Sequence, residues 1–271
     1  MQGIRKFIPT ELKARYINAL LQVGFDTLDF GSFVSKKYVP QMRDTAKVLS
    51  LLNLDNTATK LSVIVPNFSG AKTACLHPQI DHLGFPFSIS ETFQLRNTNA
   101  TRIESLKRVR KINDLCHKHN KQFVVYLSMA FGNPYGDEWS IEIARHWLEK
   151  LSVFDIKYIG LSDTVGVADS ATIEYMFGTL TKDFPNMEFG AHFHTTPDTW
   201  RQKVEPAYNN GCKRFDGAIK GFGGCPMAKN DLVGNMPTEN LLSFFDEKGE
   251  DTGLDMAKFQ TALLMANEVF A

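Results

Sequence analysis

Two histidines separated by one residue are the first candidates for chemistry in this sequence. His192 and His194 belong to the run Glu-Phe-Gly-Ala-His-Phe-His at 188–194, which has the composition of a β-strand. Alternate residues of a strand point to the same face, so the two imidazoles would lie side by side. With the side-chain oxygen of Asn235 they would form a nitrogen and oxygen ligand set suited to Mg, Mn, Zn or Fe. An isolated His-x-His pair is more often two unrelated polar residues on a solvated strand.

A glycine-rich segment at 221–226, Gly-Phe-Gly-Gly-Cys-Pro, favours the functional interpretation of the histidine pair. Glycines permit tight turns and close approach of the backbone to a ligand, so Cys225 is expected to face a pocket. A metal held nearby would lower the pKa of its thiol and make Cys225 an acid/base group. Most cysteines are small apolar core residues, and we assign Cys75, Cys116 and Cys212 to that class.

The composition describes an ordinary globular protein without a bias toward polyanionic partners. The chain has 271 residues, of which 43% are hydrophobic and 22% charged, and its formal net charge is +0. It can therefore bury a large core, and we expect no nucleic-acid or membrane partner. Four cysteines without a regular framework, and no charged-then-apolar leader, favour a reducing compartment, with the cytoplasm as the default. No apolar stretch approaches the roughly 20 residues of a bilayer-spanning helix.

Short apolar runs alternate with helical patterns along the whole sequence, which is typical of βα units around a parallel sheet. We expect helices at 11–23 and 141–151, where apolar residues recur at helical spacing. No linker-like segment divides the chain, so we predict one domain over 1–271, with a barrel at about 1–239 and a helical C-terminal tail at 240–271. The expected strands are 27–30, 61–65, 85–89, 123–127, 158–161, 188–194 and 214–219.

The predicted fold class is α/β, of the TIM (β/α)8-barrel type. A closed barrel has eight strands and carries its chemistry at their C-terminal ends. The sequence offers seven strands and opens with a helix, so we expect the first barrel strand to be the one missing from this chain. The polar residues expected at the strand ends are Asp29, Asn67, Glu91, Ser128, Asp163, His194 and Cys225.

Five motifs, in order along nearly the whole chain, resemble the hydroxymethylglutaryl-CoA lyases, within the larger group of metal-dependent TIM-barrel lyases and acyl-CoA condensing enzymes. Besides the histidine pair, and the glycine-rich segment with Gly-Asn at 234–235, three segments carry the resemblance. They are Ser-Phe-Val-Ser at 32–35 with Val-Pro-Gln-Met at 39–42 and Asp44, Pro-Asn at 66–67 with Gly70, and Ser-Asp-Thr-Val-Gly-Val at 162–167.

The resemblance implies cleavage of 3-hydroxy-3-methylglutaryl-CoA to acetyl-CoA and acetoacetate. It implies that His192, His194 and Asn235 bind Mg or Mn, which polarises the substrate oxygens. In this retro-Claisen reaction a base takes the tertiary hydroxyl proton, the carbon–carbon bond breaks, and Cys225 protonates the thioester enolate. An acyl-CoA substrate, a homodimer, and roles in leucine degradation and ketone body formation are implied as well.

The resemblance also gives roles to two carboxylates and to a set of substrate-binding residues. Asp163 would act in proton transfer or would orient a ligand. Asp29 stands where the family usually carries a Glu, which is one methylene longer, and is the third catalytic candidate after Cys225 and Asp163. The residues expected to bind substrate are Ser32, Asn67, Thr164, Gly223 and Gly224.

Three departures from the family pattern leave two other functions open. The first strand of the family ends in an Arg-Asp pair, which would lie upstream of Met1. The segment His-Thr-Thr-Pro at 194–197 replaces the usual His-Asp-Thr, and one extra residue lies between Cys225 and Asn235 in the loop expected to close over the ligand. The alternatives are a related enzyme that condenses acetyl-CoA with a 2-oxo acid, and an inactive homologue that only binds ligand.

Overall fold

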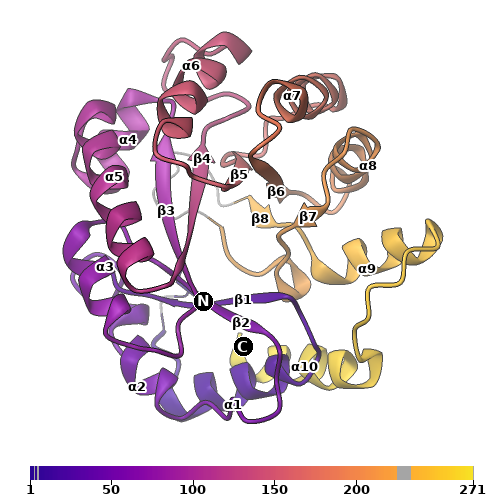
Figure 1. The fold of residues 1–271 in the computed structure, drawn as a ribbon. Helices are drawn as coiled ribbons and strands as arrows, with labels where there is room; N and C mark the ends of the chain where they lie inside the picture. The colour runs from indigo at the N-terminus through magenta and orange to yellow at the C-terminus, as the bar shows by residue number, and fades with distance from the viewer. Residues whose placement is uncertain (3, 5, 225–232, 271) are drawn as a thin grey trace.

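A curved parallel sheet with helices along its outer side organises the chain (Figure 1). The computed structural model describes residues 1–2, 4, 6–224 and 233–270. The parallel strands are hydrogen-bonded in chain order from β1 to β7, and β8 pairs with β6 in the antiparallel direction. The strands are β1 (Thr27–Ser32), β2 (Lys60–Ile64), β3 (His82–Ser88), β4 (Gln122–Ser128), β5 (Tyr158–Asp163), β6 (Glu188–Thr195), β7 (Arg214–Phe215) and β8 (Gly234–Asn235).

Helices connect successive strands, as the right-handed βα repeat requires. In the part of the chain that the structure describes, no helix combines the length and the apolar character needed to cross a membrane. The α-helices are α1 (Thr10–Leu21), α2 (Thr45–Leu49), α3 (Phe68–Cys75), α4 (Glu91–Thr98), α5 (Arg102–Lys118), α6 (Ile141–Ser152), α7 (Ser170–Asp183), α8 (Arg201–Asn209), α9 (Thr238–Glu247) and α10 (Met256–Val269); 3-10 turns occur at η1 (Pro40–Met42) and η2 (Ile219–Gly221).

The fold class predicted from the sequence is confirmed: the chain forms the α/β sheet of a TIM-type barrel with seven parallel strands. The predicted strand at 214–219 is too long. The Asp216 amide still donates to the Ala191 carbonyl of β6 at 2.9 Å. The chain then leaves β6, because the Ala218 amide donates to the Met236 carbonyl at 2.8 Å and the Thr238 amide donates to the Ala218 carbonyl at 3.0 Å. This exchange of partners turns the backbone toward α9, and η2 follows where the strand was expected.

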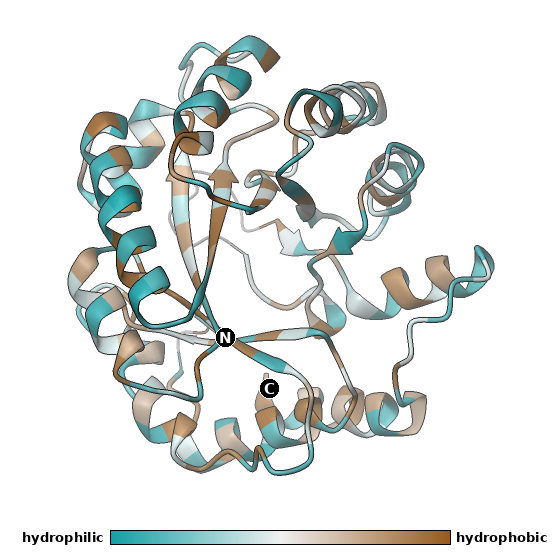
Figure 2. Ribbon diagram, viewed as in Figure 1, coloured by the Kyte–Doolittle hydropathy of each residue, from teal (hydrophilic) through white to brown (hydrophobic). Residues whose placement is uncertain are grey.

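The core lies mainly between the outer face of the sheet and its helices. Phe85 and Phe87 of β3, and Val125 and Leu127 of β4, are fully buried. Figure 2 shows brown residues along these two strands, whereas much of α5 is teal. The C-terminal segment forms two helices, and α10 packs against α1 around Phe259. The three cysteines assigned to the core are confirmed as buried and free: Cys75, Cys116 and Cys212.

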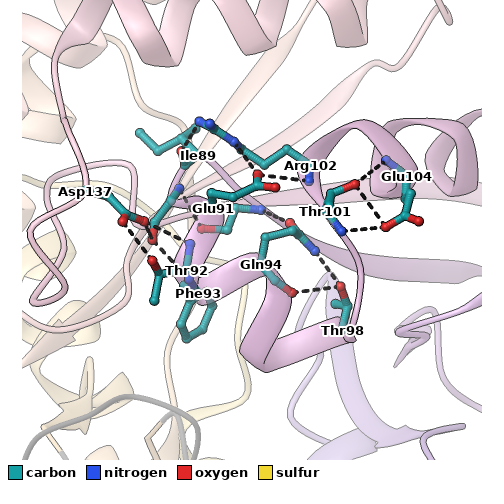
Figure 3. Close-up of polar contacts among 12 residues, drawn as sticks. Ile89, Glu91, Thr92, Phe93, Gln94, Thr98, Thr101, Arg102, Glu104 and Asp137 are labelled. Carbon is teal, nitrogen blue, oxygen red and sulfur yellow. Dashed lines mark hydrogen bonds and ion pairs between the residues drawn. The ribbon is translucent and has the colours of Figure 1, made fainter.

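Side-chain caps fix where α4 and α5 begin after β3 (Figure 3). Thr101 and Glu104 form a reciprocal capping box at the start of α5. At α4, Asp137 accepts hydrogen bonds from the Thr92 amide at 2.9 Å and from the Ser90 hydroxyl at 2.5 Å. Asp137 lies in the loop that follows β4. Its two hydrogen bonds therefore join the segments that follow the neighbouring strands β3 and β4.

Helix α3 approaches the segment after β1 through a residue without a side chain. Asn67 caps this helix by accepting from the Gly70 amide at 2.9 Å. A Cβ atom at Gly70 would collide with the carbonyl oxygen of Phe33, so only glycine allows this approach. The contact positions two of the predicted motifs, at 32–35 and 66–67, relative to each other.

Replacing Gly70 by alanine is therefore expected to destabilise the fold. Alanine has the higher helix propensity, by about 1 kcal/mol, but the collision with Phe33 outweighs it. We expect the free energy of unfolding in urea to fall by about 1–3 kcal/mol, the usual cost of overpacking. Ser69→Ala, on the exposed side of the same helix, serves as the control. Equal stability of the two variants would contradict the role given to Gly70.

Candidate active site

Strand β6 places the two histidines side by side. The centroids of the His192 and His194 rings lie 5.8 Å apart. Phe193, between them, points to the opposite face and packs edge-on against Phe131 and Phe177, with centroid distances of 5.7 and 6.2 Å. The two-residue period of the strand thus separates a polar pair from an apolar anchor.

Asn235 joins the histidines through the short antiparallel strand β8. It lies opposite His194 in the register of β6 and β8, which makes the two side chains cross-strand neighbours. Its amide nitrogen donates to the Phe222 carbonyl at 2.9 Å, which directs the amide group and leaves its oxygen as an acceptor. The structure therefore brings together the three residues predicted to bind a metal.

The glycine-rich segment lies against Asn235. Gly221 and Gly223 have φ values of +65° and +111°, which residues with side chains rarely adopt. A Cβ at Gly221 would lie 2.8 Å from the Asn235 carbonyl oxygen, and one at Gly223 would lie 2.6 Å from its amide nitrogen. Gly224, also with positive φ, is buried. Cys225 lies outside the described residues, and its role stays a prediction.

Asp216, which sequence reasoning missed, fixes the orientation of His192. Its carboxylate lies 3.0 Å from His192 Nδ1. Burial would raise the pKa of Asp216, but the hydrogen bond to His192, the charge of His192 and that of Arg214 together lower it. Asp216 is therefore a carboxylate, which accepts from Nδ1 of His192 and leaves Nε2 outside this hydrogen bond. The detectable signal was an acidic residue within the predicted seventh strand at 214–219.

Asp29 shares the inner side of the sheet with these groups. The β1–β2 register shifts between Asp29 and Gly31, a bulge that adjusts the direction of the strand here. Water reaches Asp29, yet the surrounding atoms of the curved sheet raise its pKa to about 7. The charge of Asp216 acts in the same direction, whereas His192 and the N-terminal amine oppose it. Asp29 can therefore exchange a proton near neutral pH.

Tyr126, also missed by sequence reasoning, lies beside His192. Its ring meets the His192 ring edge-on at 5.1 Å. A Cβ at Gly84 or Gly160, on the two neighbouring strands, would lie 2.9 or 2.6 Å from a carbon of the Tyr126 ring, so both glycines make room for it. Burial, followed by the charges of Asp216 and Asp29, raises the tyrosine pKa well above its usual value. Tyr126 remains a neutral phenol.

Asp163 is the last residue of β5, and its buried carboxylate accepts hydrogen bonds at both oxygens. One carboxylate oxygen accepts from the Val167 amide at 2.9 Å. The other accepts from the Ala168 amide at 3.1 Å and from Lys203 Nζ at 2.5 Å. The Lys203 ammonium also donates to the His194 carbonyl at 2.9 Å. Asp163 is thus connected to a predicted metal ligand through Lys203.

Three of the residues predicted to bind substrate make local hydrogen bonds at strand ends. The Ser32 hydroxyl donates to the Ile64 carbonyl at 2.9 Å, and Thr164 accepts from the Met129 amide at 2.8 Å. Asn67 caps α3. These bonds hold the segments after β1, β2, β4 and β5 in place, and substrate binding by these residues stays a prediction.

The neutral state of His194 suits a metal. Burial, with contributions from His192 and Lys203, lowers the pKa of His194 to about 3, so its imidazole is neutral at physiological pH. Within residues 1–224 and 233–270, as far as they are described, no three His, Cys, Asp or Glu side chains are arranged around one point. The predicted set of two imidazoles and an Asn oxygen has nitrogen and oxygen donors that fit a divalent ion.

A cavity of about 510 Å³ is lined by residues that do not belong to the predicted site. Two of its carboxylates are already engaged, Glu91 with Arg102 and Asp137 with the cap of α4 (Figure 3). None of the predicted catalytic, substrate-binding or metal-binding residues lines it: the lining residues are Glu91, Arg102, Asp137, Glu138, Glu142, Ile143, His146 and Trp147.

A parallel barrel-type sheet that gathers imidazoles, an amide and acid/base groups at its strand ends defines an enzyme of the TIM-barrel lyase class. The HMGL-like family model matches residues 1–265. The chain belongs to this family.

Curated and solved proteins agree with this assignment. The chain is 32% identical over 262 residues to hydroxymethylglutaryl-CoA lyase YngG of Bacillus subtilis, covering 97% of this chain and 87% of that protein. It is 30% identical to the cytoplasmic 3-hydroxy-3-methylglutaryl-CoA lyase of Rattus norvegicus, covering 97% of this chain and 76% of that protein. An HMG-CoA lyase from Acinetobacter baumannii, solved with coenzyme A and 3-methylmalate, superimposes with a TM-score of 0.91 at 27% identity, covering 99% of this chain and 87% of that one.

The lowered pKa of His194 predicts a specific pH dependence of stability. Between about pH 3 and pH 6.5 the unfolded chain binds a proton at this residue that the folded protein does not. The free energy of unfolding therefore falls as the pH drops from 6.5 toward 3. In the metal-free protein, His194→Gln should reduce the loss of stability between pH 7 and pH 5 measured by urea unfolding.

Thr195→Val, an adjacent change without a titratable group, is the control and should keep the wild-type dependence. An unchanged slope in His194→Gln would show that His194 protonates normally in the fold.

Proposed function

We propose that this chain is a metal-dependent carbon–carbon lyase that cleaves 3-hydroxy-3-methylglutaryl-CoA to acetyl-CoA and acetoacetate. The observation that carries the proposal is the convergence of His192, His194 and Asn235 at the adjoining ends of β6 and β8. Relatives that share the fold along nearly the whole chain are named for this activity.

The chemistry is a retro-Claisen cleavage. A base removes the proton of the tertiary hydroxyl, and its oxygen becomes the ketone of acetoacetate as the bond to the neighbouring carbon breaks. The electron pair of that bond passes to the thioester as an enolate, which Cys225 protonates as general acid to give acetyl-CoA. A divalent ion, Mg or Mn, would polarise the substrate oxygens when bound to the two imidazoles and the Asn235 oxygen.

The chain's own residues prepare this reaction. Asp216 holds His192 with Nε2 available as a ligand atom. Asp29, on the same inner side and with a pKa of about 7, is our candidate for moving the hydroxyl proton. Tyr126 packs edge-on against His192 and, as a neutral phenol, adds no negative charge there.

Substrate, assembly and location are parts of the same proposal. An acyl-CoA substrate is supported by the coenzyme A complex of the Acinetobacter baumannii enzyme, and Ser32, Asn67, Thr164, Gly223 and Gly224 are the residues we assign to its binding. We propose a cytoplasmic location, which the name of the Rattus norvegicus relative supports. The family resemblance further implies roles in leucine degradation and ketone body formation. A homodimer is the expected assembly.

The direct test is release of acetyl-CoA from hydroxymethylglutaryl-CoA with Mg or Mn. The assay uses this chain and a form extended at its N-terminus by a strand ending in Arg-Asp, because the family resemblance predicts that pair upstream. We expect Cys225→Ala to lower kcat by about a hundredfold to ten-thousandfold, the range for loss of a general acid.

Cys75→Ala, which removes a core thiol, should leave kcat within a few-fold of the parent. Absence of acetyl-CoA in both forms would contradict the lyase. Condensation of acetyl-CoA with a 2-oxo acid that survives Cys225→Ala would support the alternative enzyme.

A further inference from the structure

Lys203 is a fully buried lysine in the first turn of α8, with a relative exposure of 1%. Its ammonium makes two hydrogen bonds, to Asp163 Oδ2 at 2.5 Å and to the His194 carbonyl at 2.9 Å. Nothing in the sequence reasoning marked this residue, because a lysine on a helix is normally solvated. A buried ammonium is costly unless it is paired and hydrogen-bonded, so its position requires an explanation.

Neutralisation of Asp163 explains only half of the arrangement. A counterion for Asp163 would need no contact with β6, whereas the second bond of Lys203 goes to the main chain of His194. The parallel pairing of β5 with β6 ends at Asp163 and Phe193. The His194 carbonyl lies one residue beyond that ladder, and Lys203 supplies a donor where a further β5 amide would otherwise be needed.

The surroundings of Asp163 indicate that this carboxylate holds Lys203 and does not react itself. Its two oxygens accept from Val167, Ala168 and Lys203, and its side chain is 1% exposed. A carboxylate engaged in this way cannot reach a substrate proton without breaking these bonds. It can, however, fix the ammonium that contacts His194.

We propose that Lys203 is a positioning residue that holds the end of β6, and with it the His194 ring, in the geometry required to bind a divalent ion, with Asp163 as its counterion. Of the two roles that the family resemblance allows Asp163, this assigns it the orientation of a ligand. The proposal rests on the proposed metal-dependent function, but its structural part concerns the metal-free protein as well.

Two variants separate positioning from charge balance, because the two roles predict opposite orders of ion affinity and amide exchange for the single and the double variant. Asp163→Asn keeps the Lys203 bond to His194 and leaves the ammonium without a carboxylate. Asp163→Asn combined with Lys203→Met removes both charges and also the donor to His194. Charge balance alone predicts that the double variant recovers every property toward wild type.

Positioning predicts that the double variant recovers thermal stability but not ion binding. We expect its Mn²⁺ affinity, measured by the EPR signal of the free ion, to be about 10–100-fold weaker than wild type, the usual effect of removing a group that orients a metal ligand. Asp163→Asn should lie closer to wild type. Gln202→Met, on the exposed side of α8, is the control and should match wild type.

Hydrogen exchange in the metal-free protein provides the second readout. We expect the amides of residues 193–196 to exchange about tenfold faster in the double variant than in Asp163→Asn, the effect of losing one hydrogen bond from a charged donor. Wild-type Mn²⁺ affinity and exchange in the double variant would overturn the proposal. If wild type itself binds no Mn²⁺, the proposed metal site fails, and the order of the exchange rates alone decides the role of Lys203.

Discussion

Alternation along β6 is the constraint on which the site depends. His192 and His194 point inward, while Phe193 is anchored between Phe131 and Phe177 on the outer side. A slip of one residue would exchange these faces, burying the imidazoles among aromatic rings and exposing the phenylalanine. The parallel pairing with β5 and the antiparallel pairing with β8 both fix this register, and β8 brings Asn235 to the same place.

The charged groups of the site contact the residues assigned to the metal and are not themselves assigned as ligands. Asp216 contacts His192, and the Lys203–Asp163 pair contacts the main chain of His194, whose own imidazole is neutral. His192 thus contacts an anion through its imidazole, and His194 contacts a cation through its main-chain carbonyl. This separation lets the fold direct each ligand without placing a competing ammonium among the ligand atoms.

Short-range patterns in the sequence predicted the parts of the site that lie on one strand or one turn. The His-x-His alternation, the tight turns of the glycine-rich segment and most of the strands follow from period and composition. Asp216, Tyr126 and Lys203 could not be assigned in this way, because their roles arise from contacts of β7, β4 and α8 with β6. The predicted strand at 214–219 failed for the same reason, since Met236 takes over the pairing from β6.

The histidines as ligands of one divalent ion are the central claim, and pulsed EPR tests it most directly. The Mn²⁺-loaded protein would be prepared with natural-abundance and ¹⁵N-labelled histidine, and the nitrogen couplings of the ion would be compared. We expect couplings from two imidazole nitrogens, reduced to one in His192→Gln. A bound ion without any histidine coupling would contradict the site at the end of β6.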